Sequence, residues 1–130
     1  MIPYSRQIIT SQDIKNINKV LKSNFLTQGP KILEFEKKIA KFSDAKYSIS
    51  FNSATSALHI ACLALDVKKD DIIWTCTNSF VASANCAEYC GAKIDLIDID
   101  PISYNISIED YKELQLRFSK LFDSILEALL

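Results

Sequence analysis

The chain has 130 residues, of which 48% are apolar and 24% charged, and its formal net charge is −1. This length suits one domain or part of a larger one, and the balanced charge gives no indication of a nucleic-acid partner. No apolar run approaches the roughly 20 residues that span a bilayer, and the N-terminus lacks the order of a signal peptide. We therefore expect a cytoplasmic protein with no membrane partner.

The N-terminal part of the chain is expected to be helical. Thr10 or Ser11 can cap a helix that runs to about Ser23, with apolar residues on one face. Pro30 is well placed to open a second helix that continues through about Phe42.

The middle of the chain is expected to alternate between strands and helices. The pattern predicts strands at residues 47–51, 71–75 and 92–97, and helices at residues 54–65 and 79–89. This order implies parallel strands with right-handed crossovers. Three strands are few for a sheet that is normally covered on both faces. The expected fold class is therefore α/β, with an incomplete, mainly parallel sheet and flanking helices.

Residues 107–130 can form one long amphipathic helix. Its apolar stripe needs a partner. The stripe can pack on the sheet, pair with another copy or stay exposed, and the sequence leaves all three open.

The four cysteines, Cys62, Cys76, Cys86 and Cys90, include no CxxC pair. Cys86 and Cys90 are four residues apart on an expected helix and could begin a metal site. The only histidine is His59, and no further thiol or carboxylate cluster completes a ligand set. Buried free cysteines are the favoured interpretation, and no metal site is expected.

Small and hydroxyl residues follow the first expected strand. Free amides at a helix N-terminus favour an anion. Ala54 is small enough to let a phosphate approach the backbone, and Thr55 and Ser56 can add hydroxyl donors. Simple capping by Asn52 or Ser53 explains the same pattern, so both interpretations stay open.

A second candidate site residue is Phe80, which begins the next expected helix at the end of a strand. Ligands gather at the carboxyl ends of parallel strands, and an aromatic ring there can stack on a flat cofactor. A core position is the alternative. Glycine-rich nucleotide loops are excluded, because the chain has two glycines and no such motif.

Several motifs, in this order and spacing, resemble the DegT/DnrJ/EryC1/StrS aminotransferases: residues 52–59, 79–85 and 98–101. These are fold-type-I pyridoxal-phosphate enzymes that act on keto sugars bound to nucleotides. Residues 2–5 and 26–30 resemble the PseC branch of the family. That branch aminates C4 of a UDP-linked 4-keto-6-deoxy-N-acetylhexosamine during pseudaminic acid synthesis, a part of surface glycan synthesis.

The resemblance implies a domain organisation and a set of ligands. Residues 1–45 would be an N-terminal helical segment, residues 46–106 the start of the large cofactor-binding α/β domain, and residues 107–130 a truncated or divergent end. The implied cofactor is pyridoxal 5'-phosphate (PLP). In the full-length family, the substrates would be a UDP-linked amino-sugar precursor and L-glutamate, and the enzyme would be a homodimer.

The resemblance also assigns binding residues. The amides of Ala54 and Thr55, with Ser56 near, would hold the cofactor phosphate, and Phe80 would stack on the pyridine ring. The residues implied to lie against the nucleotide sugar are Tyr4, Asn24, Phe25, Leu26 and Thr27. The sequence departs from the family at residues 74–78, where a proline usually precedes the stacking aromatic.

The catalytic residues of the family have no counterpart in this sequence. The family uses a Schiff-base lysine, which also moves the proton, and an aspartate that protonates the pyridine nitrogen. Both come after position 130 in a full chain, and none of the fifteen Lys and Arg residues lies in a matching context. From about Leu116 the sequence is expected to stop resembling the family, as in a truncated or frameshifted gene.

Three hypotheses for function follow. The first is an aminotransferase fragment that is inactive alone. The second is one half of a split aminotransferase that another chain completes. The third is a non-enzymatic module that associates through the helix at residues 107–130.

Overall fold

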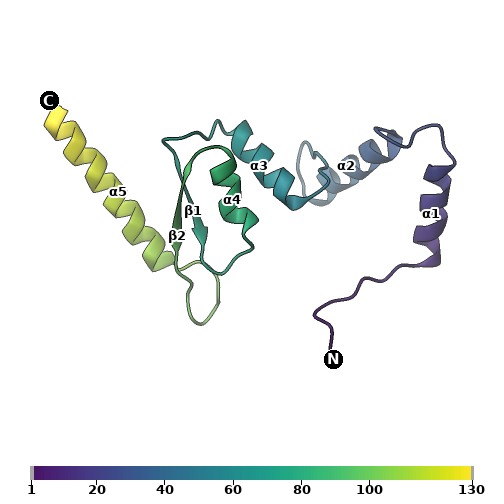
Figure 1. Ribbon diagram of the computed structural model, residues 1–130, viewed down its shortest axis with the longest axis horizontal. Helices are drawn as coiled ribbons and strands as arrows, with labels where there is room; N and C mark the ends of the chain where they lie inside the picture. The colour runs from purple at the N-terminus through teal and green to yellow at the C-terminus, as the bar shows by residue number, and fades with distance from the viewer. Residues whose placement is uncertain (1, 130) are drawn as a thin grey trace. The chain divides into compact units, whose positions relative to one another are not determined.

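The computed structural model describes the backbone of residues 2–129 and the side chains of residues 2–119. The chain divides into two units, Met1–Ser50 and Phe51–Leu130. The first unit holds α1 (Ser11–Leu21) and α2 (Pro30–Phe42), as Figure 1 shows. The second unit holds α3 (Ala54–Ala64), β1 (Ile72–Cys76), α4 (Ala82–Tyr89), β2 (Lys93–Ile97) and α5 (Ile108–Leu129).

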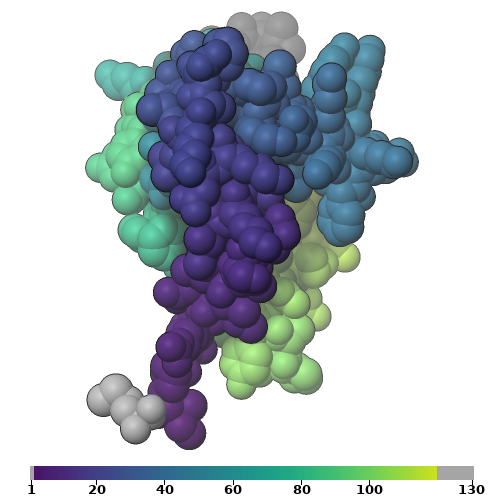
Figure 2. All heavy atoms as spheres, turned by 90° about the vertical axis from the view of Figure 1, so that its right-hand side faces the viewer, coloured from purple at the N-terminus to yellow at the C-terminus, as the bar shows by residue number. Residues whose placement is uncertain are grey.

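Thr10, one of the two caps that the sequence predicted, begins α1, and it forms a capping box with Asp13. The Thr10 hydroxyl accepts a hydrogen bond from the Asp13 amide at 3.3 Å, and the Asp13 carboxylate accepts one from the Thr10 amide at 2.7 Å. The Thr10 hydroxyl and amide lower the pKa of Asp13, because they hydrogen-bond its charged form. Residues 2–10 extend from this cap as open chain, drawn in purple in Figure 2. The second helix begins at Pro30, also as predicted.

The strand predicted at residues 47–51 is wrong. This segment has no ladder partner among the described strands, and without ladder hydrogen bonds an extended segment is not part of a sheet. Instead, the end of this segment is hydrogen-bonded to one carboxylate of the first unit. The amide and hydroxyl of Ser50 both donate to Glu36 Oε1, each at 2.9 Å. These two hydrogen bonds lower the pKa of Glu36.

The sheet of the second unit has two parallel strands among the described residues, rather than the three expected. β1 and β2 pair from Ile72 with Lys93 to Cys76 with Ile97, and α4 forms the crossover between them. The helix α4 begins three residues later than predicted, at Ala82.

The core of the second unit is small. Its buried apolar residues are Cys62, Ala82, Cys86, Ala87, Ala92 and Ile97, which come from α3, α4, β2 and the turn before β2. Within the described part of the chain, no large side chain is fully buried, and many large apolar side chains are exposed. Such a small core contributes little stability from burial.

The first half of α5 packs against the sheet. The Trp74 ring of β1 lies 5.7 Å from the Tyr111 ring and 5.4 Å from the Phe118 ring, measured between centroids. Aromatic pairs at these distances and tilts stabilise the contact beyond the area they bury. Of the three arrangements left open for the C-terminal helix, packing on the sheet is therefore observed for this half.

Gly91 follows α4 with a φ of +74°, and a Cβ built there meets nothing within 4 Å. We expect Gly91→Ala to lower the free energy of unfolding by about 1 kcal/mol, because only the left-handed backbone opposes the new Cβ. Gly91→Asn is the matched control and should lose less, since asparagine tolerates this conformation. Urea denaturation of the purified chain measures both, and equal stability of the glycine and alanine forms would contradict the expectation.

Candidate functional site

The turn that opens α3 is held by its own side chains. Ser53 is the N-cap, and its hydroxyl accepts a hydrogen bond from the Ser56 amide at 3.2 Å. The Ser56 hydroxyl donates to Asn52 Oδ1 at 2.9 Å and lies 3.0 Å from the Ser53 hydroxyl. Capping, one of the two interpretations left open by the sequence, is therefore present.

The cap leaves two amides of the helix free. Ala54 and Thr55 supply the first two N–H groups of α3, and neither donates a hydrogen bond to any described residue. The amide of Ala57, two residues further on, already bonds the Ser53 carbonyl at 3.1 Å. Capping and anion binding thus use different amides, so one does not exclude the other. We call Ser53 to Ser56 the α3 cradle.

The hydroxyl of Ser56 is already engaged. Its proton goes to Asn52, so in this geometry it supports the turn and is not free to donate to a ligand. The first turn of α3 carries no acidic residue that would repel an anion.

Phe80 lies in the turn between β1 and α4, and its side chain is 74% exposed. The core position considered from the sequence is therefore not observed. The ring borders a hollow of about 210 Å³ that is also lined by the end of β1, the start of α4 and Leu96 of β2. An exposed aromatic ring beside a hollow has a face available for stacking.

The topology places Phe80 at the carboxyl edge of the sheet, and α3 packs on α4 beside it. The helix α4 follows the carboxyl end of β1, so its start lies at the carboxyl edge. The end of α3 leads through residues 65–71 to the opposite end of β1, and Figure 1 shows α3 and α4 both running against β1. Both helices therefore start toward the carboxyl end of β1, the end at which open α/β sheets bind ligands.

The residues expected to contact the nucleotide sugar lie in the first unit. Tyr4 is fully exposed in the open N-terminal segment, and Asn24, Phe25, Leu26 and Thr27 lie in the turn between α1 and α2. The turn needs Gly29, because a Cβ there would lie 2.9 Å from the Phe25 Cβ. The turn borders a hollow of about 260 Å³ lined by Phe25, Leu26 and Gly29, among others.

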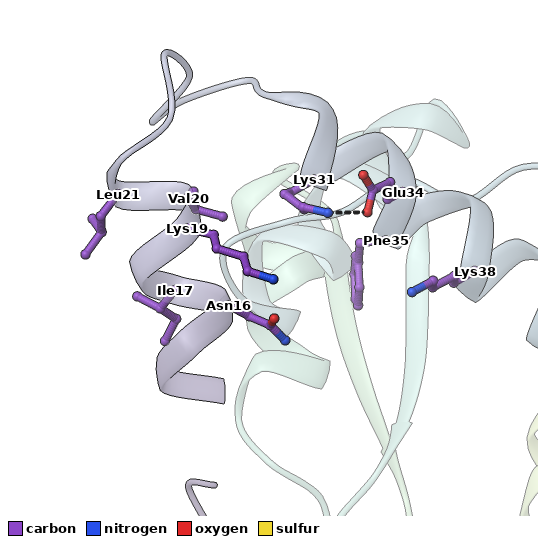
Figure 3. A pocket seen from close by; sticks show the side chains of 9 residues that line it. All are labelled: Asn16, Ile17, Lys19, Val20, Leu21, Lys31, Glu34, Phe35 and Lys38. Carbon is purple, nitrogen blue, oxygen red and sulfur yellow. Dashed lines mark hydrogen bonds and ion pairs between the residues drawn. The ribbon is translucent and has the colours of Figure 1, made fainter. Parts of the chain in front are cut away.

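A groove that the sequence did not predict lies between α1 and α2, as Figure 3 shows. This hollow of about 530 Å³ has an apolar lining that includes Ile17, Val20 and Phe35. Lysines also line it, and one of them, Lys31, pairs with Glu34 at 2.6 Å. Hydrogen bonding to Lys31 lowers the pKa of Glu34. The groove could not be found from the sequence, because it needs the two helices side by side.

The described residues contain neither a candidate metal site nor a candidate membrane span. In that part of the chain, no group of three or more His, Cys, Asp or Glu could hold a metal ion. No helix there is both long and apolar enough to cross a membrane.

Comparison with known proteins gives the family. Residues 7–119 match the DegT/DnrJ/EryC1/StrS aminotransferase family. The chain belongs to this family. Its members include sugar aminotransferases, and PLP is the family cofactor.

Two relatives match over nearly all of this chain but are about three times longer. The chain is 40% identical over 125 residues to the UDP-4-amino-4,6-dideoxy-N-acetyl-beta-L-altrosamine transaminase of Campylobacter jejuni, covering 96% of the chain and 32% of that protein. The PLP form of the putative sugar aminotransferase Spr1654 from Streptococcus pneumoniae superposes with a TM-score of 0.83 at 26% identity. That match covers 86% of this chain and 29% of the other. The fold-type-I α/β class expected from the sequence is thereby confirmed.

A third relative has a different activity. The GDP-4-keto-6-deoxy-D-mannose-3-dehydratase of E. coli, with bound hydrated PLP, superposes with a TM-score of 0.80 at 27% identity. The match covers 85% of this chain and 30% of that protein. This part of the fold is therefore shared by an enzyme named as a dehydratase and by enzymes named as aminotransferases.

The comparisons correct one expectation. The family match reaches residue 119, and the alignment with the Campylobacter relative takes in 96% of the chain. The resemblance therefore continues past Leu116, where it was expected to stop.

The α3 cradle fits the phosphate of the family cofactor. It offers two unpaired amides at a helix N-terminus, a small side chain at Ala54 and no acidic residue in the first turn. The roles of Ala54, Thr55, Ser56 and Phe80 toward PLP remain predictions.

Ala54→Asp tests the cradle. We expect it to weaken PLP binding by about tenfold or more, because a carboxylate would compete for the free amides and repel the phosphate. Ala54→Asn is the matched neutral control and should bind more tightly than the aspartate variant. NMR titration of the isotope-labelled chain would follow the Ala54 and Thr55 amide signals. Equal shifts with PLP and with pyridoxal, which has no phosphate, would contradict the assignment.

Proposed function

We propose that this chain supplies the N-terminal part of a PLP-dependent aminotransferase that acts on nucleotide-linked 4-keto-6-deoxy sugars in surface glycan synthesis. The observation that carries the proposal is the pair of free amides at Ala54 and Thr55, which suits a phosphate. The similarity to the Campylobacter transaminase favours amination over dehydration, and it favours a UDP-linked substrate. We place this substrate in the pseudaminic acid pathway because residues 2–5 and 26–30 resemble the PseC branch of the family.

This proposal gives each candidate site residue a role. The α3 cradle holds the cofactor phosphate, and the exposed Phe80 ring stacks on the pyridine ring. Tyr4 and residues 24–27 bind the nucleotide sugar, L-glutamate is the amino donor, and the working enzyme is a homodimer. PLP, when bound, supplies the electron sink for moving the amino group.

The chain does not perform this reaction alone. The lysines that flank the strands of the second unit are Lys68, Lys69 and Lys93. They precede β1 or begin β2, so they lie at the amino edge of the parallel sheet, opposite the cradle. Lys68 also pairs with Asp66 at 2.8 Å. A lysine that binds the cofactor covalently must reach the carboxyl edge.

Absorbance of the purified chain mixed with PLP tests this limit. We expect no visible absorbance band, and no single lysine to which borohydride reduction attaches the cofactor. The reason is that no lysine flanking the strands lies at the cradle edge. Peptide mapping after reduction is the measurement, and scattered low labelling of surface lysines is compatible with the proposal. Stoichiometric labelling of one lysine would show that the chain has its own covalent site.

A split enzyme is the second candidate, and the exposed apolar surface favours it. Side chains such as Phe42 and Leu65 are 90% and 79% exposed, which suits a chain whose faces another polypeptide covers. This arrangement would bring the missing lysine and aspartate from a second chain.

Co-expression tests the split enzyme. We expect the chain to co-purify with the part of the Campylobacter relative that lies beyond the matched segment, and the pair to aminate a UDP-4-keto sugar with L-glutamate. Ala54→Asp should lower this activity by about tenfold or more relative to Ala54→Asn, because it disturbs the phosphate contact. Failure to co-purify would contradict completion by a second chain. Co-purification without activity would favour the non-enzymatic association module.

A further inference from the structure

The two units of the chain carry opposite charge, although the whole chain is nearly neutral. Residues 1–50 hold nine Lys and Arg against four Asp and Glu, a formal charge of +5. Residues 51–130 hold six Lys and Arg against twelve Asp and Glu, a formal charge of −6. The two values add to the −1 of the whole chain. Opposite charges favour a contact between the first unit of one copy and the second unit of another.

The groove between α1 and α2 combines an apolar lining with basic side chains. Ile17 of α1 and Phe35 of α2 line it and are 58% and 55% exposed, so the chain itself leaves them largely uncovered. Lys19 of α1 and Lys38 of α2 point into the groove from its two sides, as Figure 3 shows. Neither lysine makes a salt bridge to a carboxylate among the described residues. The groove therefore suits an apolar group that is flanked by carboxylates.

The loop between β2 and α5 offers this combination. We call residues 98–110 the acidic knob, because they carry four acidic residues and no basic one. Its turn presents Ile102 and Tyr104, which are 87% and 65% exposed. The exposed Glu109, at the start of α5, borders the same hollow as the residues on either side of Ile102. Figure 1 shows this loop projecting past the carboxyl ends of β1 and β2.

Hydrogen bonds hold the acidic knob in one shape. Asp100 Oδ1 accepts hydrogen bonds from the amide of Ile102 at 3.1 Å and from the amide of Ser103 at 2.6 Å. The Asp100 amide donates to the Asn105 carbonyl, and the Asp100 carbonyl accepts from the Tyr104 amide, each at 2.9 Å. A loop that is ordered in advance has less conformational entropy to lose when it docks. Ile102 is thus presented as a fixed apolar group.

We propose that the acidic knob of one copy docks in the α1–α2 groove of a second copy. Ile102 enters the apolar part of the groove, and Glu109 faces Lys38. Burial of the isoleucine contributes affinity, and the charges orient the two surfaces and speed their encounter. The partner is a second copy because the knob does not occupy the groove of its own chain, where Ile102 would be covered. The proposal does not depend on cofactor binding or on the proposed reaction.

Sedimentation velocity of the purified chain at rising concentrations, in a reducing buffer without cofactor, tests the contact. We expect reversible self-association. Ile102→Ser should raise the dissociation constant by about tenfold or more, because the interface loses a buried apolar side chain. Ile8→Ser is the matched control. Ile8 is 89% exposed in the open N-terminal segment, and its replacement should leave the dissociation constant unchanged.

A charge exchange tests which surfaces meet. Lys38→Glu and Glu109→Lys should each, alone, weaken self-association by about fivefold, because like charges then face each other. Mixing the two variants should restore association, since the changed groove then meets a changed knob of opposite charge. Lys37→Glu is the matched control, because Lys37 lies on the same helix but does not line the groove. It should not weaken association, and circular dichroism checks that each variant folds.

A chain that stays monomeric at every concentration would overturn the proposal. So would a dissociation constant that Ile102→Ser leaves unchanged, or a mixture of the charge variants that associates no better than either alone. An equal loss in the Lys37→Glu control would also contradict it, because net charge and not the groove would then govern association. Self-association that none of these substitutions changes would assign the contact to a different exposed face.

Discussion

The parallel pairing of β1 with β2 is the constraint on which the second unit depends. Their register runs from Ile72 with Lys93 to Cys76 with Ile97, and α4 must cross from the end of one strand to the start of the other. This pairing defines a carboxyl edge and an amino edge. The start of α4 lies at the carboxyl edge, and Lys93 lies at the amino edge. The division between the edge near Phe80 and the edge that carries Lys93 follows from this pairing.

The first turn of α3 has both capped and free amides. The hydroxyls of Ser53 and Ser56 hydrogen-bond with each other, and the Ser53 hydroxyl also accepts a hydrogen bond from the Ser56 amide. These bonds fix the backbone of the turn before any ligand is present. The amides of Ala54 and Thr55 are left over because a helix begins with more donors than a single cap can satisfy. A turn that is already ordered has less conformational entropy to lose when it binds an anion.

The exposed apolar surface is consistent with the chain covering about a third of the length of its relatives. In the described residues, the core of the second unit consists mainly of alanine and cysteine, with Ile97 the largest buried apolar residue. The indole N–H of Trp74 is buried beside α5 without a hydrogen-bond partner among the described residues. Both features suit a structural unit that packs against further protein in the family fold.

The sequence by itself determined the local structure and the family. Thr10, Pro30 and Ser53 specify the starts of helices through short-range hydrogen bonds and allowed backbone angles, and the sequence predicted all three. Motif order also gave the family and its cofactor. These features depend on neighbours close in the chain, or on patterns that can be read directly.

The tertiary structure decided what depends on distant partners. Residues 47–51 alternate like a strand, yet among the described residues they have none to pair with, and a carboxylate on α2 holds their end instead. Packing also decided that Phe80 is exposed and that Trp74 meets α5. The free amides of the cradle are also decided by the tertiary structure. Only the hydrogen bonds of the folded turn determine which amides the cap uses and which stay free. Burial and pairing are set by the chain as a whole, and local sequence cannot fix them.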